Sequence, residues 1–92
     1  MNKHIIIKIS GRVQGVWFRK SAQNEARQLG VSGFARNNVD DTVTIEACGE
    51  ENNIKELLKW SYKGSKFARV DNVKYEIDDN CGDINYKEFK IL

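Results

Sequence analysis

Residues 4–29 read HIIIKISGRVQGVWFRKSAQNEARQL and contain the strand, loop and helix that decide the fold. The β-branched residues Ile5, Ile7 and Ile9 alternate, which predicts a strand over residues 4–10. The glycine-bounded segment 11–15 ends this strand. Apolar residues then recur at helical spacing, at Phe18, Ala22, Ala26 and Leu29. This spacing predicts a helix over residues 18–29, which Gly30 would end.

The same periodicities predict the other elements of the chain. Two strands at 32–37 and 42–48 flank Asn38, Val39, Asp40 and Asp41, which indicates a hairpin. A second helix is predicted over residues 51–62, because apolar residues again share one face. Two further strands are expected near 68–77 and 86–91, joined by a polar loop over 78–85.

The order strand, helix, strand, strand, helix, strand is the split βαβ pattern of the ferredoxin-like α+β class. We therefore expect an antiparallel sheet of four to five strands with both helices on one face. The chain contains no proline, and we find no repeat or low-complexity segment, so no linker is indicated. Residues 1–92 are interpreted as a single domain.

Composition narrows the possible partners and location. Fifteen Lys and Arg against thirteen Asp and Glu leave a formal charge of +2, which is too small to indicate nucleic acid or anionic lipid as a partner. The N-terminal residues show neither a signal peptide nor a transmembrane pattern. We expect a cytoplasmic protein, and a monomer.

The two cysteines and the single histidine show no pattern typical of a metal or redox site. Cys48 and Cys81 lie 33 positions apart without a CxxC pair. Two structural thiols are the expected state in the cytoplasm, although a disulfide stays possible. His4 lies far from the loop that follows the first strand, and we expect no catalytic role for it.

The loop Gly11-Arg12-Val13-Gln14-Gly15-Val16-Trp17-Phe18-Arg19 connects the first strand to the first helix. Main-chain N–H groups of such a loop and of the helix start can bind an anion. Arg19 lies in the first helical turn, where a cation opposes the helix dipole, and a bound phosphate would resolve this conflict. The alternative is a solvated arginine. The Gly-Lys-Ser/Thr ending of a nucleotide-binding loop is absent, so we predict a site for one phosphoryl group that requires no metal or cofactor.

Two segments, GRVQGVWFR and GFARNNVDDTV, resemble the two signature motifs of the acylphosphatase family, and the resemblance covers nearly the whole chain. It implies a hydrolase acting on an acid anhydride, the carboxyl–phosphate bond of small acyl phosphates. It further implies that main-chain N–H groups of residues 14–19 hold the phosphate, that Arg19 binds it, and that Asn37 orients the attacking water. The phosphate-binding residues are then Gln14, Gly15, Val16, Trp17, Phe18 and Arg19. Without the resemblance, Asn37 reads as a turn residue.

Three departures from the family pattern are visible, and two of them bear on the site. Trp17 stands where a glycine is common, and we expect it to be tolerated. Asp41 stands where the hairpin usually has glycine, so the turn is expected to differ or to be strained. The third departure, Phe34 and Ala35 in the second motif, should alter packing alone.

Two alternatives to an active enzyme remain. One is a vestigial phosphate-binding form without turnover, and the other is a binding module for RNA or a metabolite. The near-neutral charge and the absence of exposed strand aromatics argue against RNA.

Overall fold

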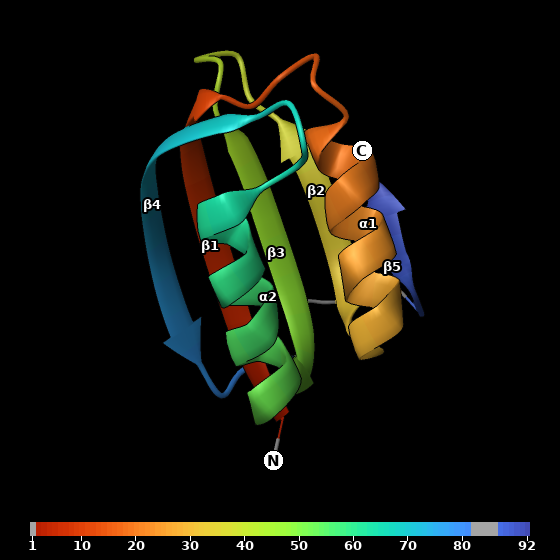
Figure 1. Ribbon diagram of the computed structural model, residues 1–92. Coiled ribbons are helices and arrows are strands. Elements are labelled where there is room, and N and C mark those ends of the chain that lie inside the picture. The colour runs from red at the N-terminus through yellow and green to blue at the C-terminus, as the bar shows by residue number, and fades with distance from the viewer. Residues whose placement is uncertain (1, 82–86) are drawn as a thin grey trace.

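A computed structural model describes residues 2–81 and 87–92 (Figure 1). The elements are β1 (Asn2–Arg12), α1 (Phe18–Leu29), β2 (Ser32–Asn37), β3 (Val43–Glu50), α2 (Glu51–Lys63), β4 (Arg69–Asp78) and β5 (Phe89–Ile91). Their order confirms the predicted split βαβ pattern. None of the helices in this part of the chain is long and apolar enough to cross a membrane.

The five strands form one sheet in the order β4-β1-β3-β2-β5, and both helices cover the same face (Figure 1). Helix α1 packs on β2 and β5, whereas α2 packs on β1, β3 and β4. The predicted alternation is confirmed, because Ile5, Ile7 and Ile9 of β1 are fully buried beneath the helices. Hydrophobic burial between sheet and helices therefore holds the fold together.

The expectation of a wholly antiparallel sheet is wrong at one edge, where β5 runs parallel to β2. The register explains the direction. Strand β4 ends at Asp78, opposite His4, and His4 in turn pairs with Cys48 near the end of β3. Cys48 pairs with Ser32 at the beginning of β2. The chain that leaves β4 thus reaches the opposite edge at the starting end of β2, and β5 must run alongside β2 in the same direction.

The bounds of α1 and β2 follow the prediction. The predicted end of the first strand at residue 10 is wrong, because β1 continues through Gly11 to Arg12, which still pair with β4. Helix α1 spans the predicted residues 18–29, and Gly30 adopts a left-handed conformation at its end. Strand β5 comprises three residues instead of the predicted six. Half of the loop predicted at 78–85 lies outside the described residues, as does the first residue of the last predicted strand.

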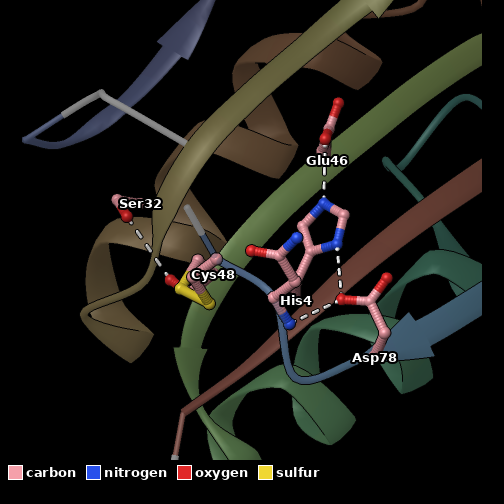
Figure 2. The surroundings of a disulfide bond; sticks show 7 residues. His4, Ser32, Glu46, Cys48 and Asp78 are labelled. Atoms are coloured by element: carbon pink, nitrogen blue, oxygen red, sulfur yellow. Dashed lines mark hydrogen bonds and ion pairs between the residues drawn. A yellow bond between two sulfur atoms is a disulfide. The ribbon is translucent and has the colours of Figure 1, made fainter. Parts of the chain in front are cut away.

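The expectation of free thiols is wrong, because Cys48 and Cys81 form a disulfide (Figure 2). Their Cα atoms lie 5.7 Å apart, within the usual range for a disulfide. The reason lies in the tertiary structure, since Cys81 follows the end of β4 and lies beside Cys48, near the end of β3. The spacing of the two cysteines in the sequence does not show that they meet in the folded chain.

His4 takes a structural position beside the disulfide, between two carboxylates from the neighbouring strands (Figure 2). Its Nε2 lies 2.8 Å from Oε1 of Glu46 on β3, and its Nδ1 lies 3.1 Å from Oδ1 of Asp78 on β4. Burial opposes the charged imidazolium, but the hydrogen bonds to Glu46 and Asp78 outweigh it and raise the pKa of His4 above its ordinary value. The protonated ring thus joins β1 to both of its neighbours.

We expect the protein to lose stability as the pH rises above about 6.5, the ordinary pKa of histidine. The raised pKa in the folded state means that protonated His4 stabilises the fold fully below this value, and that this contribution is lost as the pH passes the folded-state pKa. Urea unfolding at about pH 6 and about pH 8.5 checks this, with His4→Gln as the control. The stability difference between wild type and the variant should shrink at the higher pH. A constant difference would contradict the assigned role.

Candidate active site

A pocket of about 490 Å³ opens where β1 ends, α1 begins and β2 ends. It is lined by Val13, Gly15, Trp17, Phe18, Arg19, Lys20, Asn37 and Ile91. The two predicted catalytic residues, Arg19 and Asn37, therefore line the same pocket although they come from different elements. Four of the six predicted phosphate-binding residues also line it: Gly15, Trp17, Phe18 and Arg19.

The main chain of the loop curls twice before the helix begins. Gly15 has a φ of 73° and Trp17 a φ of 62°, both in the left-handed region. Within the described residues, the N–H groups of residues 14–19 donate to no protein acceptor. Helix α1 has no capping side chain and no acidic residue in its first turn. Unpaired N–H groups and an uncompensated helix dipole make this end of α1 receptive to an anion.

Arg19 places its guanidinium at this end of α1, where Nη1 donates to the main-chain oxygen of Leu92 at 2.8 Å. The end of the chain therefore lies beside the start of α1 (Figure 1). Lys20 also lines the pocket, with its Nζ donating to Oε1 of Gln23 at 3.1 Å. Two cations thus adjoin the start of α1. Their positive charge repels the positive end of the helix dipole, but it attracts a bound phosphate.

Asn37 is the last residue of β2 and lies before the turn instead of within it. Its side-chain oxygen Oδ1 is buried and accepts no hydrogen bond within the described residues. A buried acceptor without a donor costs about 1–3 kcal/mol, so such atoms are rare outside functional sites. Asn37 lines the pocket, and its amide oxygen keeps an unused capacity to accept a hydrogen bond.

Gln14 and Val16 support the loop without lining the pocket. The Gln14 amide Nε2 donates to the main-chain oxygens of Asn38 at 2.7 Å and Thr42 at 2.9 Å. The oxygen of Val16 accepts from the buried hydroxyl of Ser65 at 2.8 Å. The Gln14 side chain thereby joins the loop between β1 and α1 to the hairpin that follows Asn37.

The hairpin itself is held by its own polar groups. Asp41 has a φ of 72°, so a residue other than glycine occupies the left-handed position, as the sequence suggested. The Asn38 N–H donates to the oxygen of Thr42 at 2.8 Å. Hydrogen bonds from the Thr42 hydroxyl, Lys8 and the Thr42 N–H lower the pKa of Asp40 to about 2. Several hydrogen bonds thus hold the turn despite the strained residue, and they support the end of β2, where Asn37 lies.

Sequence reasoning did not assign four pocket features to the site: Val13, Lys20, Ile91 and the Leu92 contact to Arg19. The latter two come from the parallel placement of β5, which no local pattern reveals. No group of three His, Cys, Asp or Glu residues in the part of the chain described here is arranged to hold a metal ion.

We expect Gln14→Glu to disturb the site more than Gln14→Met. The glutamate carboxylate would face two main-chain oxygens that now receive hydrogen bonds, whereas methionine keeps the shape and only loses the two donors. Methionine should cost about 1–3 kcal/mol of stability, and glutamate more. Thermal unfolding together with kcat measures both effects. Equal stability of the two variants would contradict the donor role of the Gln14 amide.

Fold and pocket together define a small α+β protein of the ferredoxin-like class with an anion-receptive loop. A family model described as Acylphosphatase matches residues 5–91. An acylphosphatase of Legionella pneumophila (strain Lens) is 52% identical over 73 residues, which cover 77% of this chain and 80% of that protein. An acylphosphatase of Caldanaerobacter subterraneus subsp. tengcongensis is 41% identical and covers 99% of both chains. The solved structure of an acylphosphatase from Coxiella burnetii superimposes with a TM-score of 0.90 at 33% identity, covering 99% of this chain and 93% of that one.

The chain belongs to the acylphosphatase family and is a hydrolase of the acylphosphatase type. Members of this family act on small acyl phosphates.

Proposed function

We propose that this chain hydrolyses the carboxyl–phosphate bond of small acyl phosphates, giving a carboxylate and inorganic phosphate, without a metal ion or cofactor. One observation carries the proposal. A single pocket combines a helix start with unpaired N–H groups, the Arg19 guanidinium and a buried amide oxygen of Asn37 that lacks a donor.

The phosphate group is the part of the substrate that the loop would bind. The N–H groups of residues 14–19 donate to its oxygens, and the planar guanidinium of Arg19 can donate two parallel hydrogen bonds. Phosphoryl transfer spreads negative charge over the equatorial oxygens, which these donors stabilise. Charge stabilisation is the main requirement here, because the carboxylate is already a good leaving group.

Asn37 would orient the attacking water. A water hydrogen donates to Oδ1, which directs the water oxygen toward the phosphorus atom. The new bond forms between this oxygen and phosphorus while the bond from phosphorus to the acyl oxygen breaks. The carboxylate leaves with the electron pair of that bond, and a phosphate oxygen accepts the proton of the water. No general base is needed in this scheme.

Hydrolysis of benzoyl phosphate, followed by loss of ultraviolet absorbance with EDTA present, tests the proposal. Turnover that persists in EDTA supports a metal-independent acylphosphatase. A folded protein that binds inorganic phosphate without turnover would overturn the proposal in favour of the vestigial form. A folded protein that does neither would favour a metabolite-binding module.

We also propose a monomer. For its location, the Cys48–Cys81 bond favours an oxidising compartment over the cytoplasm that the sequence indicates, and the two cysteines provide the test. Disulfides persist mainly in oxidising compartments. Alkylation of intact cells at harvest, followed by mass measurement, distinguishes the two cases. Alkylated thiols at both positions support the cytoplasm, and a bridged pair indicates an oxidising compartment.

A further inference from the structure

We infer that Trp17 determines substrate specificity, its indole forming the acyl side of the pocket and favouring aromatic acyl phosphates over acetyl phosphate. This inference rests on the proposed function and names the substrate class of the same site. It concerns the side chain of Trp17, whereas phosphate binding concerns the N–H group of that residue.

The first argument is that Trp17 occupies a position that suits glycine. Its φ of 62° and ψ of 21° lie in the left-handed region, where a bulky residue is strained. The side chain does not compensate by capping the helix, since it makes no cap hydrogen bond. Glycine would meet the needs of the main chain here without strain. Backbone geometry therefore gives no reason for a tryptophan.

The second argument is that packing gives no reason either. Trp17 remains 74% exposed, whereas Trp60, the other tryptophan, packs against Phe18 with ring centroids 5.2 Å apart. A large exposed apolar side chain that is also strained contributes little to stability. Its position on the wall of the pocket supplies the missing reason.

The third argument is the division of the pocket into a polar and an apolar part. Arg19, Asn37 and the loop N–H groups provide the polar part, whereas Val13 and Phe18 are almost fully buried and offer little surface. The exposed apolar surface comes from Trp17 and Ile91. At about 490 Å³ the pocket falls within the range of about 300–1000 Å³ typical of sites that enclose whole ligands. On this inference, the indole of Trp17 borders the space beyond the phosphate.

An aromatic acyl group fits this surface better than a methyl group. A planar ring can stack in an offset manner on the indole and remove apolar area of both rings from water. The methyl group of acetyl phosphate is too small to cover the indole. The preference should therefore appear in kcat/KM for benzoyl phosphate relative to acetyl phosphate.

The experiment measures this ratio of kcat/KM values in wild type, Trp17→Phe and Trp17→Ala. Phenylalanine and alanine both carry a Cβ atom, so both place the same demand on the left-handed main chain, and they differ in the ring. We expect the benzoyl-to-acetyl ratio to fall roughly tenfold in Trp17→Ala and to stay within about twofold of wild type in Trp17→Phe. Any loss through the main chain lowers both substrates alike and leaves the ratio unchanged.

An unchanged ratio in Trp17→Ala would overturn the inference, even if both activities fall. If Trp17→Ala does not fold, Trp17→Gly replaces it, since glycine lacks the indole and tolerates the left-handed conformation. If the wild type hydrolyses acetyl phosphate and neither variant changes the benzoyl-to-acetyl ratio, the specificity role of Trp17 is contradicted. The proposed function stands in that case. Wild type that hydrolyses neither substrate overturns the proposed function, and this inference with it.

Discussion

Replacing Arg19 with alanine should reduce kcat/KM for benzoyl phosphate roughly a thousandfold and largely abolish inhibition by inorganic phosphate. The guanidinium lines the pocket at the start of α1, where it can donate two charge-assisted hydrogen bonds to one phosphate. Each such bond contributes about 1.5–3 kcal/mol, so the loss of two amounts to about 4 kcal/mol, or about three powers of ten. Steady-state kinetics with phosphate as a competitive inhibitor measures both quantities.

Two further variants separate the geometry of Arg19 from its charge. Arg19→Lys keeps the charge but not the planar pair of donors, so it should recover only part of the lost activity. Arg27→Ala removes an arginine from the last turn of the same helix, where it forms an exposed pair with Glu88 at 3.7 Å. This control should retain wild-type phosphate inhibition. Equal phosphate inhibition in wild type and Arg19→Ala would contradict the phosphate-binding role.

The sequence predicts most of this site because its residues lie in two short local motifs. Gly15, Arg19 and the helix start follow one another within a single loop, so the helix dipole argument applies without knowledge of the fold. Asn37 was assigned through family resemblance, since a lone asparagine before a turn favours turn chemistry. The structure adds an observation that the sequence does not contain, a buried Oδ1 without a donor within the described residues, on a residue that lines the pocket.

The sequence does not predict what the last strand contributes. Ile91 lines the pocket and the main chain of Leu92 contacts Arg19, both through parallel pairing of β5 with β2. The direction of β5 depends on where the chain crosses the end of the sheet, and the Cys48–Cys81 bond marks this crossing. Neither hydrophobic periodicity nor cysteine spacing predicts the direction of β5. The bounds of α1, by contrast, follow from its own apolar residues and from Gly30.

Replacing Asn37 with alanine should lower kcat by about 100- to 1000-fold, the usual cost of removing one group that acts in the transition state. Inhibition by inorganic phosphate should change little, because the loop and Arg19 remain. Stability should stay the same or rise, since the variant removes a buried acceptor that has no donor within the described residues. Turnover and thermal unfolding, measured on the same preparations, should therefore show a large loss of kcat without a loss of stability.

The adjacent asparagine provides a matched control with the opposite expectation. The Asn38 amide donates to the hydroxyls of Thr42 at 2.9 Å and Thr44 at 2.8 Å, so Asn38→Ala removes bonds that hold the hairpin. It should lose stability and reduce kcat far less than Asn37→Ala. If Asn37→Ala instead keeps kcat within about threefold of wild type, or loses stability in parallel with activity, its amide serves the turn and not the water. The two stability changes make this distinction independent of the absolute rate, because Asn37→Ala removes an acceptor that has no donor within the described residues, whereas Asn38→Ala breaks two hydrogen bonds.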